Sequence, residues 1–195
     1  ANLLYDRVPA TSPLKGTAVI RVAENLDATG DRDEALRRLG NIVRANPEDL
    51  DALSVLGDLQ RTAERYAEAA ETYSRALDLT GGTAPGDWRF YYVRGIAYER
   101  NKEWEKAEAD FQRALELRPD QPQVLNYLGY SWVDQGMHLA EALEMIEKAV
   151  EAAPNDGYIV DSLGWAFYRL GRYDEAVQAL ERVVQLRPGD PEIND

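Results

Sequence analysis

Apolar residues recur along this chain at the three- and four-residue spacing of amphipathic helices. Tyr91 and Tyr98 lie on one such stripe, and Ala107 and Phe111 lie on the next. A period of 3.6 residues predicts helices that each bury one face. Short polar segments that contain acidic residues, such as GRYDEA at 171–176, separate one helix from the next. Acidic residues suit the first turn of a helix, so the pattern predicts helical hairpins.

The hairpin pattern repeats with marker residues in register. A small residue stands in the first helix of each repeat at intervals of 34 to 38 residues, an alanine follows in the second helix, and proline or glycine ends the pair. The markers are Ala23, Gly57, Gly95, Gly129 and Gly164, then Ala35, Ala69, Ala107, Ala142 and Ala176, then Pro47, Gly81, Pro119, Pro154 and Pro188. This register predicts an array over 16–190, with units 16–49, 50–87, 88–121, 122–156 and 157–190.

The small markers have a physical reason. Two helices joined by a tight turn must approach closely, and a larger side chain would force them apart. We expect the bulky residues of the second helices to fill the space between units; these are Tyr73, Phe111, Ile146 and Leu180.

The order of glycine, aromatic, alanine and proline markers resembles the tetratricopeptide repeat (TPR) family. The stretches LNYLGYSWVDQG…EALEMIEKAVEAAPND (125–156) and VDSLGWAFYRLGRYDEAVQALERVVQLRP (160–188) fit it closely. The resemblance implies an all-α fold, a right-handed superhelical solenoid of five tandem helix-turn-helix units. Three local departures are an insert at 81–87, an extra residue around 137–140, and Ala23 in place of glycine.

The two ends do not fit a whole repeat. Residues 1–15 are interpreted as a lead that is the tail of an earlier helix, with a disordered leader as the alternative. Residues 191–195 match the start of a truncated sixth unit, so the chain is interpreted as part of a longer protein. Val177, Leu180 and Val184 of the last helix would then lack a capping partner, and self-association through this end is expected.

Composition limits the partners. The chain has 22 Lys and Arg residues against 35 Asp and Glu residues, a formal net charge of −13, which disfavours nucleic acid and anionic lipid. No apolar run is long enough for direct membrane insertion. There is no cysteine, so disulfides and thiol chemistry are excluded.

No motif indicates an enzyme or a cofactor. The single histidine, His138, has no ligand partners at metal-binding spacing. Ser12 and Lys15 match a Ser-x-x-Lys pattern without its companion motifs, and no glycine-rich phosphate loop is present. Carboxylates on the second helices are interpreted as a solvated face. No catalytic residue, metal site or cofactor is therefore predicted.

The TPR resemblance implies a concave groove lined by the first helices, where a peptide or protein ligand would lie. Counting from the first residue of each unit, the second, fifth, ninth and twelfth places form the groove stripe. This stripe includes Ile20, Glu24, Ile96 and Val133. The predicted binding residues on it are Tyr92, Asn126, Tyr130, Tyr158, Asp161, Trp165 and Tyr168.

Two neighbouring aromatic residues have different expected roles. Phe167 falls on the core stripe, whereas Trp165 falls on the groove stripe, where it either contacts a ligand or packs against the next unit. Asn126 and Asp161 could hydrogen-bond a peptide backbone. The Lys-Asn-Asn-Lys-Arg clamp of chaperone-binding TPR proteins is missing, and an acidic, aromatic groove favours basic and apolar ligands.

The expected function is a protein-interaction scaffold that binds a peptide or protein segment within a larger assembly. The alternative is a regulatory or structural segment of an enzyme whose catalytic domain lies elsewhere. The amino-acid sequence of the last two repeats further resembles long, multi-repeat bacterial TPR proteins. That resemblance implies the bacterial cell envelope, on its periplasmic side, with the cytoplasm as the alternative.

Overall fold

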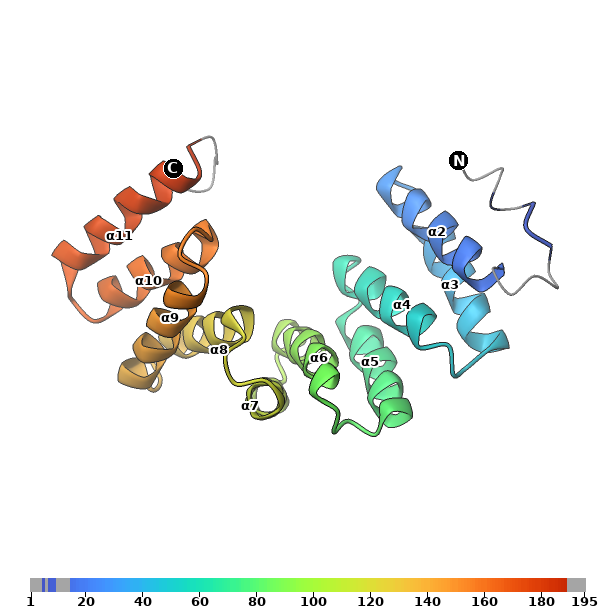
Figure 1. Ribbon diagram of the computed structural model, residues 1–195, viewed down its shortest axis with the longest axis horizontal. Helices are drawn as coiled ribbons and strands as arrows, with labels where there is room; N and C mark the ends of the chain where they lie inside the picture. Colours follow the sequence, from blue (N-terminus) through green and yellow to red (C-terminus); the bar gives the residue numbers. More distant parts are fainter. Residues whose placement is uncertain (1–4, 6, 10–14, 189–195) are drawn as a thin grey trace. The chain divides into compact units, whose positions relative to one another are not determined.

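A computed structural model describes Tyr5, residues 7–9 and residues 15–188 of the chain (Figure 1). Residues 15–188 form ten α-helices and one 3-10 turn, and contain no strand. The elements are α2 (Lys15–Ala28), α3 (Arg32–Ala45), α4 (Leu50–Thr62), α5 (Tyr66–Thr80), η1 (Pro85–Asp87), α6 (Trp88–Arg100), α7 (Trp104–Leu117), α8 (Pro122–Gln135), α9 (Leu139–Ala152), α10 (Gly157–Arg169) and α11 (Tyr173–Leu186). The all-α prediction is confirmed.

Consecutive helices pair into five hairpins, one within each predicted unit, apart from Lys15 at the start of α2. The insert predicted at 81–87 forms the η1 turn, where the Asp87 carboxylate accepts a hydrogen bond of 2.9 Å from the Ala84 backbone nitrogen. Most of the expected lead at 1–15, and all of 191–195, lie outside the described residues.

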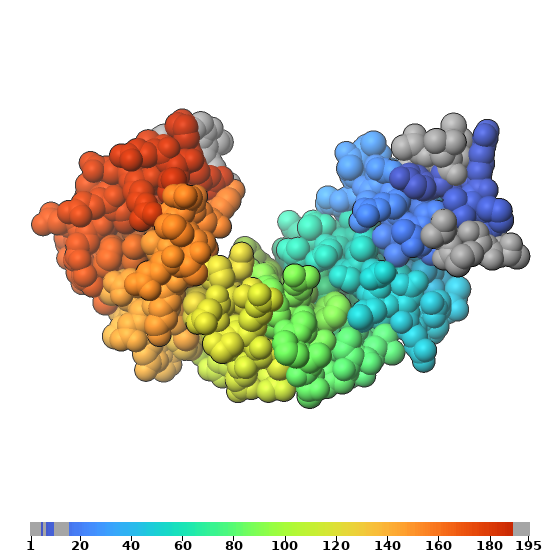
Figure 2. All heavy atoms as spheres, in the orientation of Figure 1, coloured from blue at the N-terminus to red at the C-terminus, as the bar shows by residue number. Residues whose placement is uncertain are grey.

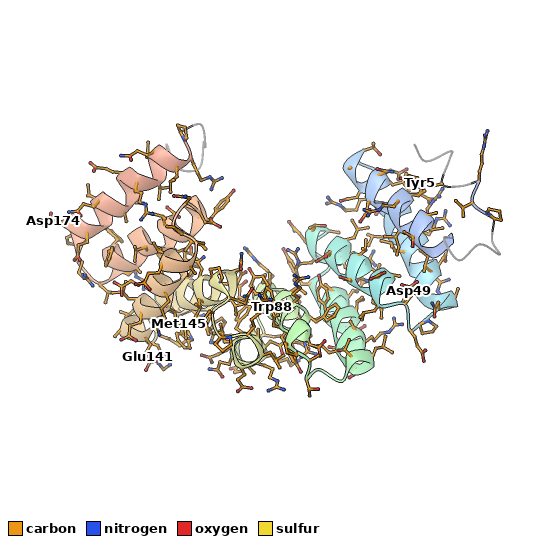
Figure 3. All side chains as sticks on the ribbon, in the orientation of Figure 1. Tyr5, Asp49, Trp88, Glu141, Met145 and Asp174 are labelled. Atoms are coloured by element: carbon orange, nitrogen blue, oxygen red, sulfur yellow. The ribbon has the colours of Figure 1, made fainter. Side chains whose placement is uncertain are left out.

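Side-chain caps fix where two of the helices begin. Asp49, labelled in Figure 3, accepts a hydrogen bond of 2.9 Å from the Ala52 nitrogen at the start of α4. The Asp156 side chain accepts hydrogen bonds from the Tyr158 and Ile159 backbone nitrogens at the start of α10. These bonds satisfy backbone N–H groups that have no partner within the helix.

The chain divides into two compact units, residues 1–117 with α2 to α7 and residues 118–195 with α8 to α11. In the first unit α3 packs on α4 and α5 packs on α6, whereas in the second unit α8 and α9 both pack on α10. The space-filling view shows that side chains close the gaps left by the ribbons between paired helices (Figure 2). Buried aliphatic side chains form the core of each hairpin, and buried aromatic side chains join them in the last four hairpins.

The bulky residues of the second helices each cover the glycine of their own hairpin. Tyr73 also packs in one cluster with Ala97 of the next unit, as expected for a residue between units. A methyl group added at Gly57 would lie 2.5 Å from Cε1 of Tyr73, and one at Gly95 would lie 2.6 Å from Cε1 of Phe111. Ile146 and Leu180 cover the other two marker glycines, with closest distances of 2.9 and 3.0 Å. The glycines therefore set how closely the paired helices approach.

A buried ion pair connects three helices of the first unit. The Arg94 guanidinium on α6 donates two hydrogen bonds, of 2.7 and 2.8 Å, to the Asp110 carboxylate on α7. It donates a third, of 2.9 Å, to the Ser74 hydroxyl on α5. The rings of Tyr91 and Tyr98 lie 5.4 and 5.7 Å from the guanidinium carbon. One side chain therefore ties the second repeat to the third.

Replacing Gly95 by alanine should destabilise the first unit by about 1–3 kcal/mol, because the new methyl group would overlap the buried Phe111 ring. Gly40→Ala is the matched control in α3, where the nearest atom would be 4.0 Å away. That change should stabilise the helix by up to about 1 kcal/mol. Urea unfolding followed by circular dichroism measures both, and equal effects would contradict the close approach.

Removing Asp110 should cost about 3–5 kcal/mol of stability, because Asp110→Ala leaves the mostly buried Arg94 guanidinium without its counter-ion. The control is Glu68→Ala. Glu68 pairs with Arg65 at 2.6 Å on the surface, and its loss should cost less than about 1 kcal/mol. Thermal melts of both variants test this difference, and an Asp110→Ala variant that melts like the control would refute it.

Candidate peptide-binding site on the second unit

Four of the seven predicted binding residues line one cavity in the second unit. Tyr130 comes from α8, and Asp161, Trp165 and Tyr168 come from α10. Gly164 and Leu180 complete a lining that encloses about 370 Å³. Tyr130 and Tyr168 are 41% and 53% exposed, so both rings can meet a ligand.

Helix geometry aligns the α10 residues. Asp161, Trp165 and Tyr168 are spaced four and three residues apart, which puts them on one face of the helix. Gly164 carries no side chain, and a methyl group added there would lie 3.0 Å from the Leu180 side chain of α11. The cavity therefore forms beside the same close contact that joins the two helices.

The Trp165 ring is held on more than one side. It stacks on Tyr168 with a centroid distance of 5.5 Å and an interplanar angle of 20°. The Arg169 guanidinium carbon lies 5.5 Å from its centroid, and Arg169 also donates a hydrogen bond of 2.9 Å to the Asp134 carbonyl of α8. The Trp165 indole nitrogen is buried and has no hydrogen-bond partner in the described part of the chain.

Asp161 is a half-buried carboxylate at this cavity. Burial raises the pKa of Asp161 above its ordinary value, and the positive charge of Arg187 opposes this rise. Within residues 15–188, no ion pair or hydrogen bond joins the Asp161 side chain to another group.

A cavity at the corresponding face of the first unit differs in that its carboxylates have hydrogen-bond or ion-pair partners. Its lining includes three carboxylates, Glu24, Asp27 and Asp58. Arg21 pairs with Glu24 at 2.8 Å, and Arg32 pairs with Asp27 at 2.6 Å. Asp58 accepts a hydrogen bond of 2.8 Å from the Tyr73 hydroxyl. All three carboxylates of this cavity therefore have partners.

The remaining three predicted residues do not join this cavity. Tyr158 is 62% exposed and packs under Arg187, whose guanidinium carbon is 3.5 Å from its ring centroid. Asn126 keeps a buried Oδ1 atom that accepts no hydrogen bond from the described residues.

Tyr92 belongs to the first unit, where its ring lies 6.2 Å from Trp88 and 6.3 Å from Phe111. Burial raises the pKa of Tyr92. Trp88, labelled in Figure 3 at the start of α6, shares with Tyr92 the lining of a separate cavity of about 470 Å³.

Two expectations about the groove stripe are wrong. Ile20 and Val133 are buried core residues, because neighbouring helices cover the side of the helix that they face. Phe167 is buried at 8% exposure, as its core place predicted. Sequence reasoning missed Leu180 as a cavity residue, because its place in the repeat matched a packing position. Its exposure, 42%, agrees with the sequence expectation for the last helix, but its place in the cavity lining is visible only in the structure.

The last helix carries an apolar face. Tyr173, Val177, Leu180 and Val184 are all at least 42% exposed along α11. At the places of the last three in α9, Leu143 and Ile146 are buried and Val150 is half-buried. The exposure fits the expected self-association, which stays a prediction.

Among the described residues, no group of three or more His, Asp or Glu side chains could hold a metal ion. The His138 ring packs at a tilt against Trp132 with a centroid distance of 4.9 Å, which gives the histidine a packing role. No described helix combines the length and the apolar character needed to cross a bilayer.

Relatives of known sequence share the repeats. A TPR repeat-containing protein of Pseudomonas aeruginosa is 30% identical over 171 residues, and human tetratricopeptide repeat protein 13 is 23% identical over 167 residues. These alignments cover 88% and 86% of the chain. The chain spans only 28% and 19% of the length of these two relatives.

Solved structures share the fold. A crystal structure of MamA matches with a TM-score of 0.71 at 23% identity, over 91% of this chain and 94% of that one. YrrB matches with a TM-score of 0.68 at 19% identity, over 99% and 96% of the two chains. A chain of the Cut9–Hcn1 complex gives 0.80 at 19% identity, over 98% of this chain and 37% of that one.

The repeats also match models of one protein family. The tetratricopeptide repeat models match residues 23–84, 88–121 and 128–191, which together are most of the chain. The five hairpins, the marker glycines and the solenoid neighbours agree with these matches. The chain belongs to the tetratricopeptide repeat family.

Proposed function

We propose that this chain is a protein-interaction scaffold that holds a peptide or protein segment on its second unit, across α8 and α10, as part of a larger assembly. The TPR family is generally a non-catalytic protein-interaction module. YrrB is described as a TPR protein with an unusual peptide-binding site. The relatives are several times longer than this chain, which is in line with a role inside a larger protein.

The observation that carries the proposal is the exposed aromatic surface beside a cavity. Tyr130, Tyr158 and Tyr168 are all more than 40% exposed on the two first helices of this unit. Aromatic side chains are enriched at binding hot spots, because they supply a large contact area with few rotatable bonds. Clustered exposed rings that neither stabilise the fold nor bind a ligand would only make the protein more prone to aggregate.

The rigidity of the site supports the same function. Asp161, Trp165 and Tyr168 stand on one capped helix, and Trp165 is stacked between neighbours. A surface held in this way loses little conformational entropy on binding, so more of the contact energy remains as affinity. The α8 residue Tyr130 belongs to the same compact unit, so both walls of the cavity lie within one unit.

Tyr130→Ala should weaken binding of a segment selected on this chain by about 2 kcal/mol, roughly 30-fold, because the ring lines the cavity. A random peptide library selected on the 195-residue chain supplies the ligand, and calorimetry measures the affinity. Leu79→Ala is the control, since Leu79 on α5 is 43% exposed, close to the 41% of Tyr130, and lies outside the cavity. Equal losses in both variants, or a library without binders, would refute the proposal.

Trp165→Ala and Phe167→Ala separate binding from folding. Phe167→Ala should cost about 3–5 kcal/mol of stability, because it leaves a cavity in the core. Trp165→Ala should cost only about 1–2 kcal/mol, mainly from its lost contact with Tyr168, while abolishing most ligand affinity. Thermal melts compare them, and a Trp165→Ala variant that melts as low as Phe167→Ala would make Trp165 a core residue.

A further inference from the structure

We propose that the cavity of the second unit is a subsite for a lysine or arginine side chain of the bound segment, with Asp161 as its counter-ion. This inference rests on the proposed function, because it names the chemistry that the same surface recognises. The aromatic rings of Tyr130, Trp165 and Tyr168 and the Leu180 side chain would receive the aliphatic part of that side chain.

The lining of the cavity has one charge, and it is negative. Asp161 is the only ionisable acid or base among the six lining residues apart from the two tyrosine hydroxyls, and no lysine or arginine is among them. Aromatic faces attract cations through their quadrupole, so the rings and the carboxylate favour the same ligand charge. The formal net charge of −13 would also draw a basic segment towards the chain.

The carboxylate is available. Arg169 donates a hydrogen bond to the Asp134 carbonyl, and Arg187 donates one to the Tyr158 hydroxyl, while the positive charge of Arg187 lowers the pKa of Asp161 from a distance. Neither forms an ion pair with Asp161 within the described residues. In the first unit, by contrast, Arg21 and Arg32 pair with two of the three carboxylates of the corresponding cavity, and the Tyr73 hydroxyl donates to the third. Of these two cavities, only that of the second unit has a carboxylate that forms no ion pair or hydrogen bond with the described residues.

Partial burial makes the charged form of Asp161 less stable in the absence of a ligand. A half-buried charge without a partner has lost part of its hydration, and the raised pKa of Asp161 reflects this loss. A cation brought next to the Asp161 carboxylate gives it an electrostatic partner, in a site where solvent screens the interaction less than in open water. The long apolar stems of lysine and arginine can cover Leu180 and the rings while their charged ends reach the carboxylate.

The cavity volume and the Trp165 indole nitrogen, which has no acceptor among the described residues, fit a peptide rather than a free ion. A volume of about 370 Å³ has room for one long side chain and its adjoining backbone. The buried Trp165 indole nitrogen lacks an acceptor, and a buried donor without one destabilises the free form. A backbone carbonyl next to the basic residue would supply that acceptor after a small side-chain movement.

Short blocked peptides test the subsite directly. The probes are acetyl-Gly-X-Gly-amides in which X is lysine, arginine or the neutral isostere norleucine, titrated into the ¹⁵N-labelled 195-residue chain and followed by NMR. We expect the basic peptides to shift the Trp165 indole and Asp161 amide signals and to bind about ten times more tightly than norleucine. Equal binding of norleucine would overturn the cation proposal.

Matched variants assign the selectivity to one carboxylate. Asp161→Asn keeps the shape of the side chain and should abolish the preference for lysine and arginine. Asp120→Asn removes the same charge from an exposed turn of the same unit and should leave the preference unchanged. Thermal melts should show both variants folded. A preference that survives Asp161→Asn would overturn the assignment.

The peptide library separates this inference from the proposed function. Binders that depend on Tyr130, contain an enriched basic residue and lose affinity in Asp161→Asn support both. Binders that depend on Tyr130 but show no basic enrichment and no loss in Asp161→Asn overturn the subsite alone. A library without binders, together with blocked peptides that do not bind, overturns both.

Discussion

The close contact between a glycine of the first helix and a bulky side chain of the second is the constraint on which four of the five hairpins depend. Tyr73 and Phe111 cover Gly57 and Gly95 so tightly that a single methyl group would overlap their rings. This contact fixes the distance between paired helices. In these hairpins it also decides which stripe of the first helix is buried against its partner and which stripe lies beside it.

The candidate site is a consequence of the same contact. Gly164 lets α11 approach α10, and Leu180, which covers that glycine, becomes one wall of the cavity. The other walls come from the neighbouring stripe of α10 and from Tyr130 on α8. A larger residue at Gly164 would therefore change both the stability of the hairpin and the shape of the site.

Two partly buried carboxylates in this chain have opposite surroundings. Asp110 receives two hydrogen bonds from Arg94 and joins repeats, which is a structural role. Asp161 has no such partner within the described residues and stands at a cavity with aromatic walls. A buried charge is tolerated when it is paired, so an unpaired one beside a cavity points to a ligand.

The sequence by itself determined the helices, the hairpin units and the marker glycines, because these depend on local periodicity and on residue size. It also separated Phe167 in the core from the exposed Tyr168, since a helical period assigns neighbours to different faces. Only the tertiary structure decided that Tyr130, Asp161, Trp165 and Tyr168 share a cavity, while Asn126 and Tyr158 of the same unit do not line it. It likewise placed Ile20 and Val133 in the core. Periodicity gives the direction in which a side chain points, but the helix that packs there determines whether it is covered.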